Sequence, residues 1–597
     1  MVAGARFPRL GEGGVADHML GDADKGWIRY CRIMLEWLHP KRNLDPERWV
    51  QEVVSRAQAL NVDTLLFDMY HGGYAVFDNA VAPKDRHIGA CDMLALLDNA
   101  VHAQGMRLAL MHMGAHAAHF TSLEYPAWRE RDAGTESHVP PMHITAQMCL
   151  NSPYAGFVRM LRQVIDATSP NTALMVCPGP RPFENDYVDY AAWAPYVDAI
   201  THERMWGFGR DHERPIKPKL FELGLSMQVS RAESDKPSLG TIWLGWHVDR
   251  DYSPSTAPHY RLNFAEILAC GATPQLHAQT IFEVDQSEMK TVREMFDLVQ
   301  IVRPFLADAR LVPFAALVVD YSDFRVSQNM KGFYQALIEN HVPFEVISSR
   351  DLRLERLTRY KVVVLPNTVR MSERQVEAVK AYHAAGGGVV FTFRTGCVGD
   401  NNALRRASPF GAMAGIDGPF GVVTRPSGTA AEDVPHCYYR VLQQHPVAAE
   451  SFGRLQSFRG SFTKIAATDG TPIAQALDFD YSKMHRHHPA MGWYPGHAYA
   501  PMIVVNEPSA GGRVVYSAAE FDREAYELGL PGAMKALAQA TVWAASEPAP
   551  VTIVGFPMVE MVVHYSAVLD AYTLMLVNQT TNELAEYDAV VARRSVS

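Results

Sequence analysis

No stretch of this 597-residue chain approaches the roughly 18 uninterrupted apolar residues that a membrane-spanning helix requires. Residues 1–26 carry Gly, Asp and Glu where a secretory signal would need an apolar core. Lysine and arginine form no cluster, and the net charge of −10 argues against a nucleic-acid surface. The seven cysteines are odd in number and lack C-x-x-C spacing, which indicates reduced thiols. We therefore expect a cytoplasmic protein with neither a membrane nor a nucleic-acid partner.

The first large part of the chain, residues 27–309, alternates between strand-like and helix-like segments. Asp45 and Pro46 mark one helix start, with Asp as the N-cap and Pro at the first helical position. Strands that alternate with helices predict a parallel sheet, and a span of about 280 residues favours a closed (β/α)8-like barrel. Seven of its strands are recognisable, at 28–37, 63–70, 106–113, 172–177, 197–202, 240–246 and 273–278.

A second α/β unit is expected over residues 310–547. Ser372 caps a helix that a run of three glycines ends at Gly386. Residues 404–508 are rich in Gly, Pro and aromatics, which predicts an insertion of β structure and loops within this unit. Residues 548–597 alternate between apolar and polar positions and predict a small β domain, while residues 1–26 form an N-terminal extension.

Polar and aromatic residues recur where the predicted barrel strands end, which is where barrels keep their active sites. Aromatic faces stack on sugar rings, while carboxylates and imidazoles bind hydroxyl groups. The pattern therefore predicts a carbohydrate site. Its expected substrate-binding residues are His71, Tyr74, His112, His116, Arg181, His202, Trp206, Trp246, His247 and His277.

Glycoside hydrolysis usually needs two carboxyl groups, one acting as the acid and one as the nucleophile or base. Glu203, flanked by His202 and Trp206 just past an apolar strand, is the first candidate; the alternative is that it merely pairs with Arg204 or Arg32. Glu36 and Asp68 compete for the second role. Their alternative is a structural hydrogen bond or a contact with a substrate hydroxyl.

Two histidine groups have spacings that suggest a metal site. One comprises His112, His116 and His119, and the other His485, His487 and His488. No carboxylate lies within the first group, and the second falls in a loop before Pro489. Hydroxyl binding or plain packing is favoured, so no metal and no cofactor is expected.

Several motifs follow one another in the first part of the chain. They are Phe67-Asp68, Tyr70-His71-Gly72-Gly73-Tyr74, His112-Met113-Gly114, Tyr125-Pro126-Ala127-Trp128-Arg129, Asp132-Ala133-Gly134 and Cys149-Leu150-Asn151-Ser152-Pro153-Tyr154. In this order they resemble the barrel called hypothetical glycosyl hydrolase family 6, which is related to α-L-fucosidases of glycoside hydrolase families 29 and 151. The resemblance implies a glycosidase barrel.

The second unit contains the motifs Asp351-Leu352, Leu357-Thr358-Arg359-Tyr360-Lys361, Leu365-Pro366-Asn367 and Gly386-Gly387-Gly388. They resemble the trimerisation domain of family 42 β-galactosidases, and Leu576-Val577-Asn578 resembles the last β domain of the same family. The resemblance implies a fold similar to that of class I glutamine amidotransferases, which is flavodoxin-like. No G-x-C-x-G elbow follows Leu365, and Cys397 lies one strand later, so we expect a structural domain. This domain implies a homo-oligomer, a trimer or a dimer.

One departure from the family pattern concerns the fourth barrel strand. Such strands commonly end in an Asp followed by Gly-Pro, whereas this chain has Cys177-Pro178-Gly179-Pro180. The sequence therefore predicts an exo-acting glycoside hydrolase, fucosidase-like or galactosidase-like, on a small sugar or oligosaccharide, with its second carboxylate from Glu36 or Asp68. The alternatives are a non-hydrolytic carbohydrate-binding protein and a metal-dependent hydrolase.

Overall fold

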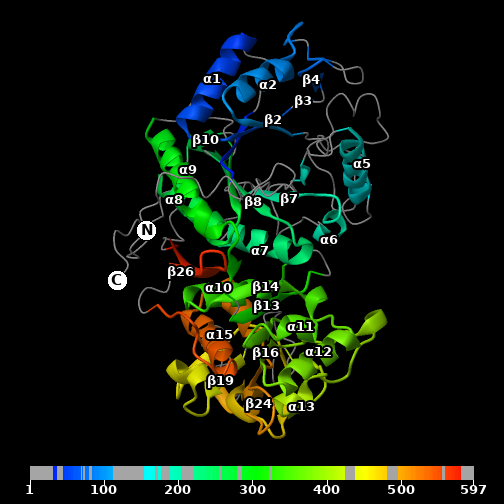
Figure 1. The fold of residues 1–597 in the computed structure, drawn as a ribbon. Coiled ribbons are helices and arrows are strands. Elements are labelled where there is room, and N and C mark those ends of the chain that lie inside the picture. Colours follow the sequence, from blue (N-terminus) through cyan, green and yellow to red (C-terminus); the bar gives the residue numbers. More distant parts are fainter. Residues whose placement is uncertain are drawn as a thin grey trace, which may run out of the picture.

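The computed structural model describes most of the chain between Cys31 and Gln579. The described residues are 31–36, 45–68, 70–71, 74–78, 84–85, 87–111, 153–168, 173–176, 189–203, 221–243, 245–248, 251–254, 257–277, 286–312, 314–321, 326–423, 437–479, 495–553 and 559–579. Within them no helix is long and apolar enough to cross a membrane. Two large α/β units follow one another along the chain, and a small sheet lies beside them (Figure 1).

The first unit is built on a curled parallel sheet that is consistent with a barrel. Its seven described strands have the order β5-β2-β1-β11-β8-β7-β6, so the last strand along the chain pairs with the first. The strands are β1 (Ile33–Glu36), β2 (Thr64–Asp68), β5 (Arg107–Met111), β6 (Met175–Val176), β7 (Ala199–Glu203), β8 (Ser238–Trp243) and β11 (Thr273–His277). The sequence predicted each of these seven strands, and no eighth is present in the described part of the sheet.

Helices cover the outside of this sheet, as Figure 1 shows for α1, α2, α8 and α9. The helices are α1 (Pro46–Ala59), α2 (Met93–Ala103), α5 (Pro153–Thr168), α6 (Tyr190–Trp193), α7 (Glu222–Ser234), α8 (Ala257–Ala269) and α9 (Gln286–Leu306). Helix α1 begins where the sequence predicted, because the Asp45 side chain accepts a hydrogen bond from the backbone N of Arg48 and Pro46 occupies the first turn.

Two short hairpins follow the ends of barrel strands directly. β3 (Tyr70–His71) pairs antiparallel with β4 (Tyr74–Ala75) after β2, and β9 (Gly245–Val248) pairs antiparallel with β10 (Asp251–Pro254) after β8. Both hairpins therefore continue from the carboxyl-terminal edge of the parallel sheet.

The second unit is a nine-stranded sheet covered by helices on both faces. Its order is β14-β13-β15-β16-β25-β24-β23-β19-β20, in which the first five strands are parallel and the rest antiparallel. These are β13 (Ala315–Val319), β14 (Phe344–Ser348), β15 (Val362–Leu365), β16 (Gly388–Thr392), β19 (Cys437–Val441), β20 (Leu455–Phe458), β23 (Thr471–Phe479), β24 (Pro495–Asn506) and β25 (Val514–Ser517). The expected insertion thus extends the sheet itself, because β19, β20, β23 and β24 pair into it.

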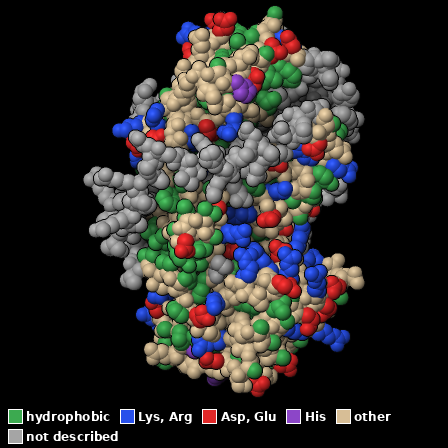
Figure 2. Space-filling view, in the orientation of Figure 1, with side chains coloured by type: hydrophobic (Ala, Val, Ile, Leu, Met, Phe, Trp, Pro, Cys, Tyr) green, Lys and Arg blue, Asp and Glu red, His purple; other side chains and the backbone are tan. Residues whose placement is uncertain are grey.

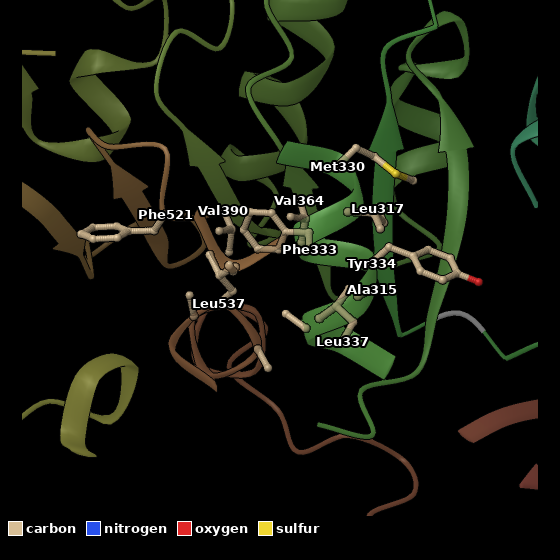
Figure 3. Packing of buried hydrophobic residues seen from close by; sticks show 14 of the residues in the cluster. Ala315, Leu317, Met330, Phe333, Tyr334, Leu337, Val364, Val390, Phe521 and Leu537 are labelled. Atoms are coloured by element: carbon tan, nitrogen blue, oxygen red, sulfur yellow. The ribbon is translucent and has the colours of Figure 1, made fainter. Parts of the chain in front are cut away.

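The helices of this unit are α10 (Gln328–Glu339), α11 (Leu354–Leu357), α12 (Glu373–Ala384), α13 (Gly411–Ala414), α14 (Phe521–Leu528) and α15 (Pro531–Ala544). On one face Phe333 and Leu337 of α10 and Leu537 of α15 pack against Val364 and Val390 of the sheet (Figure 3). The opposite face packs against α12, which starts in the capping box that Ser372 and Gln375 form. Short pieces complete the unit: β17 (Ile416–Asp417), β18 (Val422–Val423), β21 (Phe462–Thr463), β22 (Ala466–Ala467) and the 3₁₀ turns at Ser349–Asp351, Asp400–Asn402 and Pro446–Ser451.

The third sheet has the order β12-β26-β27. It combines β12 (Arg310–Leu311), which follows the first unit, with the C-terminal hairpin of β26 (Val559–Ser566) and β27 (Ala571–Asn578). Val577 packs against Leu262 and Ala269 of α8. The described residues 559–578 therefore form β structure as predicted.

Candidate active site

Several of the residues singled out from the sequence end the strands of the first sheet at one common edge. The register pairs Glu36 with Phe67, Asp68 with Met111, and Glu203 with Thr241. His277, the last residue of β11, pairs with Leu35 of β1 on one side and Trp243 of β8 on the other. Since all these pairings are parallel, Glu36, Asp68, Glu203 and His277 lie at the carboxyl-terminal edge of a single curled sheet.

The hairpins bring four further candidates to the same edge. His71 of β3 pairs with Tyr74 of β4, in the hairpin that follows Asp68, the last residue of β2. Trp246 and His247 lie on β9, where they pair with Ser253 and Tyr252 of β10. His112, His116, Arg181 and Trp206, together with Cys177 and both histidine groups with metal-like spacing, lie outside the described residues.

The packing of the strands distinguishes the interior of the curled sheet from its helix-covered outside. Ile33, Leu66 and Ala199 pack together on the inner face, with Leu239 of β8. Met34 and Phe67, one residue along from inner positions, pack instead against the helical layer. Side chains alternate in this way along every strand, so a residue's position in the register decides which layer it belongs to.

Glu36 belongs to the helical layer. It lies two residues after Met34, is 0 % exposed, and accepts a hydrogen bond of 3.0 Å at Oε1 from Nη1 of Arg56 on α1. Burial raises the pKa of this carboxyl to about 8, although the Arg56 charge acts in the opposite direction. The contact observed for Glu36 is therefore a structural hydrogen bond, which the sequence analysis gave as the alternative to a catalytic role.

His202 also faces the helices. Its ring is 0 % exposed, and Nε2 lies 2.8 Å from the hydroxyl oxygen of Ser230 on α7. Burial lowers the pKa of His202 to about 3, so the imidazole is neutral at ordinary pH. The structure therefore does not support the substrate-binding role expected for His202, because its ring is enclosed between β7 and α7.

Arg32, one of the two cations that the sequence offered as an alternative partner for Glu203, is engaged elsewhere. Its guanidinium lies 3.4 Å from the Asp63 carboxylate and donates to the backbone oxygen of Asn61. No group of three or more His, Cys, Asp or Glu side chains suited to a metal ion occurs among the described residues.

Sequence reasoning missed the partners that bind Glu36 and His202. Arg56 follows Glu36 by 20 residues and Ser230 follows His202 by 28 residues, on helices whose packing against the sheet the sequence does not specify. The alternation of side chains along the strands was a usable signal. Glu36 lies two residues after apolar Met34, and His202 lies two residues after apolar Ile200, so each is expected on the same face of the sheet as that apolar residue.

Comparisons with known proteins agree with this architecture. Residues 316–437 match the family model described as the beta-galactosidase trimerisation domain. A comparison with curated proteins finds no match.

Solved structures of glycosidases are similar to almost the whole chain. An alpha-L-fucosidase isoenzyme 2 from Paenibacillus thiaminolyticus is 16% identical, with a TM-score of 0.68 over 95% of this chain and 91% of that one. A beta-galactosidase from Bacillus circulans sp. alkalophilus is 13% identical, with a TM-score of 0.63 over 89% and 91%. An exo-beta-1,4-mannosidase from Opitutaceae bacterium strain TAV5 is 11% identical, with a TM-score of 0.54 over 89% and 98%. At these identities the likeness is one of fold.

Proposed function

We propose that this protein is a glycoside hydrolase that acts on a small sugar or oligosaccharide from its end. Glu203 and Asp68 are the proposed pair of carboxyl groups. The observation that carries the proposal is their common position at the carboxyl-terminal edge of a curled parallel sheet, since barrel enzymes place their chemistry at this edge. The fold likeness to three proteins named as glycosidases supports the same class.

Alternation along the strands supports the choice of this pair. Asp68 follows the inner residue Leu66 by two positions, and Glu203 follows the inner residue Ala199 by four. The backbone alternation therefore assigns Asp68 and Glu203 to register positions of the inner layer, unlike Glu36. This leaves Asp68 as the partner of Glu203.

The strand order separates the two residues within the sheet. β2 and β7 are four strands apart, with β1, β11 and β8 between them. We propose that the curl of the sheet brings the two strand ends to face each other across its interior. Carboxyl groups about 5–5.5 Å apart would retain the anomeric configuration, and a separation of about 6.5–9.5 Å would leave room for a water and invert it.

The remaining proposed residues bind the sugar. His71 and Tyr74 come from the hairpin after β2, Trp246 and His247 from the hairpin after β8, and His277 from the end of β11. Aromatic rings among them would stack on the apolar face of a pyranose, and the imidazoles would bind its hydroxyl groups. His112, His116, Arg181 and Trp206 are proposed for the same role from the sequence, fucoside and galactoside being the candidate substrates.

A second candidate function is carbohydrate binding without hydrolysis. It is favoured by the fourth strand, β6, which ends at Val176 and is followed in the sequence by Cys177-Pro178 where related barrels commonly carry a catalytic Asp. A protein of this kind would bind a sugar at the same edge but release it unchanged.

The experiment is a screen of nitrophenyl glycosides, including α-L-fucoside and β-galactoside, with purified protein. Glu203→Gln and Asp68→Asn should each lower kcat by about 10²- to 10⁴-fold on the best substrate, the range of one acid–base group. Glu52→Gln, on the exposed part of α1, is the matched control and should leave kcat unchanged. Near-normal turnover by Glu203→Gln would refute the assignment, whereas sugar binding by calorimetry with no turnover would establish the second candidate.

Further proposals concern the rest of the molecule. We propose that residues 310–547 form an amidotransferase-like domain that assembles copies of the chain, because its region 316–437 matches the trimerisation family model. We also propose, from the odd number of cysteines and their lack of C-x-x-C spacing, that the protein works in the cytoplasm.

A further inference from the structure

The two large units share a continuous hydrophobic core. One cluster of buried residues contains Ile200 of β7 and Phe221 before α7, and it also contains Tyr321, Met330 and Phe333 of the second unit. The outer face of β7, the strand that ends in Glu203, therefore belongs to the same buried core as side chains of the second unit.

A line of buried aromatic rings crosses this junction. Tyr321, just after β13, stacks on Tyr190 of α6 with ring centroids 5.5 Å apart and planes at 26°. Tyr190 in turn contacts the ring of His202, with centroids 5.9 Å apart. Both tyrosines are 2 % exposed and His202 is 0 % exposed. The three rings thus connect the carboxyl-terminal end of β13 in the second sheet to His202, the residue that precedes Glu203.

A chain of hydrogen bonds holds the other side of His202. Its Nε2 lies 2.8 Å from the Ser230 hydroxyl of α7, which lies 3.0 Å from the Ser238 hydroxyl at the start of β8. His202 is therefore fixed between Tyr190 on one side and Ser230 on the other, with no freedom to change rotamer without opening the core.

A polar contact joins the same two units nearby. Arg350 of the second unit lies 3.8 Å from Asp189, the N-cap of α6, and 3.6 Å from Glu233 of α7. Figure 2 shows basic side chains gathered where the two units meet. The Arg350 side chain is 48% exposed, so solvent screens its charge. The Glu233 side chain is 1% exposed, and burial raises its pKa, so this carboxyl can take up a proton when Arg350 is removed. Arg350 offers a matched control, because it bridges the same junction without touching His202.

We propose that Tyr321 of the second unit is a positioning residue for Glu203, acting through Tyr190 and His202 on the end of β7. This inference rests on the proposed function, in which Glu203 reacts. It gives the second unit a role in the barrel site beyond assembly, because a shift of β7 by about 1 Å would move the carboxyl out of its reactive geometry.

The test compares four variants by kinetics on the best glycoside and by hydrogen exchange of peptides that cover residues 199–203. Tyr321→Leu keeps apolar volume but removes the stacked ring, and should lower kcat about 10- to 100-fold with KM changed by less than about threefold. Ser230→Ala removes the hydrogen bond to His202 and should act in the same direction. Tyr321→Phe keeps the aromatic ring and removes only the hydroxyl group, and Arg350→Gln breaks the polar contact. Both variants should resemble the wild type in kcat and KM.

The exchange measurement separates this inference from the proposed function. Tyr321→Leu should raise amide exchange in residues 199–203 above that of Arg350→Gln, whether or not the wild type hydrolyses any glycoside. A wild type without turnover would refute the hydrolase proposal alone. Unchanged exchange in Tyr321→Leu, or loss of kcat in Tyr321→Phe equal to that in Tyr321→Leu, would overturn the positioning role.

Discussion

Glu36 and Glu203 each end a strand of the same sheet, and the structure gives Glu36 a partner, Arg56, on the helical side. Burial raises the pKa of Glu36 to about 8, so near pH 7 it is mainly the protonated carboxyl that contacts Arg56, and removing it leaves the guanidinium without this hydrogen-bond partner. We predict that Glu36→Ala lowers the free energy of unfolding at pH 7 by about 1–3 kcal/mol, measured by urea denaturation. The kcat of the folded fraction should stay near that of the wild type.

The control for this prediction is Glu52→Ala. Glu52 pairs with Arg48 on the exposed face of α1, so its loss should cost less than about 1 kcal/mol. A Glu36→Ala protein that is fully stable but inactive would return Glu36 to the list of catalytic candidates and remove Asp68 from its place in the proposal.

Two buried histidines make the stability of the protein depend on pH. Burial lowers the pKa of His202 to about 3 and that of His564 to about 4. In the unfolded chain each histidine would titrate near its ordinary pKa of 6.5. Below that pH the unfolded state binds more protons than the folded state, so the protein loses stability as the pH decreases.

We therefore predict that, between pH 7 and pH 5, each histidine contributes a loss of about 2 kcal/mol in the free energy of unfolding. His564→Asn should make the pH dependence less steep by that amount. Equal slopes for wild type and His564→Asn, from denaturation at the two pH values, would contradict the prediction.

At the scale of elements, α10 and α14 pack with their backbones in unusually close approach. A Cβ added to Gly332 of α10 would lie 1.8 Å from the backbone carbonyl oxygen of Asp522 at the start of α14. Neither helix can yield there, since Asp522 is 0 % exposed and accepts hydrogen bonds from Asn329 and Thr392.

We predict that Gly332→Ala destabilises the second unit by about 3 kcal/mol, the upper part of the usual range for overpacking. Gly532→Ala, in the first turn of α15, meets nothing within 4 Å and should be neutral or stabilising by about 0.4–1 kcal/mol. Thermal unfolding of both variants checks the pair, and a Gly332→Ala melting temperature equal to that of the wild type would show that the two helices can separate freely.

At the scale of the whole molecule, residues 316–437 match the family model described as a trimerisation domain, which supports the proposed homo-oligomer. Closed symmetry is the default for soluble homo-oligomers. We predict that light scattering at micromolar concentration gives a mass of two or three times 66.4 kDa. A single species at the monomer mass over that concentration range would end the proposal of a homo-oligomer.

Much of this architecture could be predicted from local patterns. The alternation of apolar strands with capped helices indicated seven barrel strands, and Asp45 and Ser372 marked helix starts correctly. Such features depend on residues within one or two turns of each other, so they are readable without a tertiary structure. The pairing of β19, β20, β23 and β24 into the second sheet was not foreseen, because strand partners far apart in the chain leave no local trace.

By itself, the sequence determined that Glu36, Asp68, His202 and Glu203 lie at or beside strand ends of a parallel sheet, because hydrophobic runs and their breaks define the ends of buried strands. Only the tertiary structure decided which layer Glu36 and His202 belong to and which groups surround them. Arg56, Ser230 and Tyr190 reach those two residues through the packing of whole helices on the sheet. The burial that shifts the pKa values of Glu36 and His202 is a property of that packing, and no local stretch of sequence specifies it.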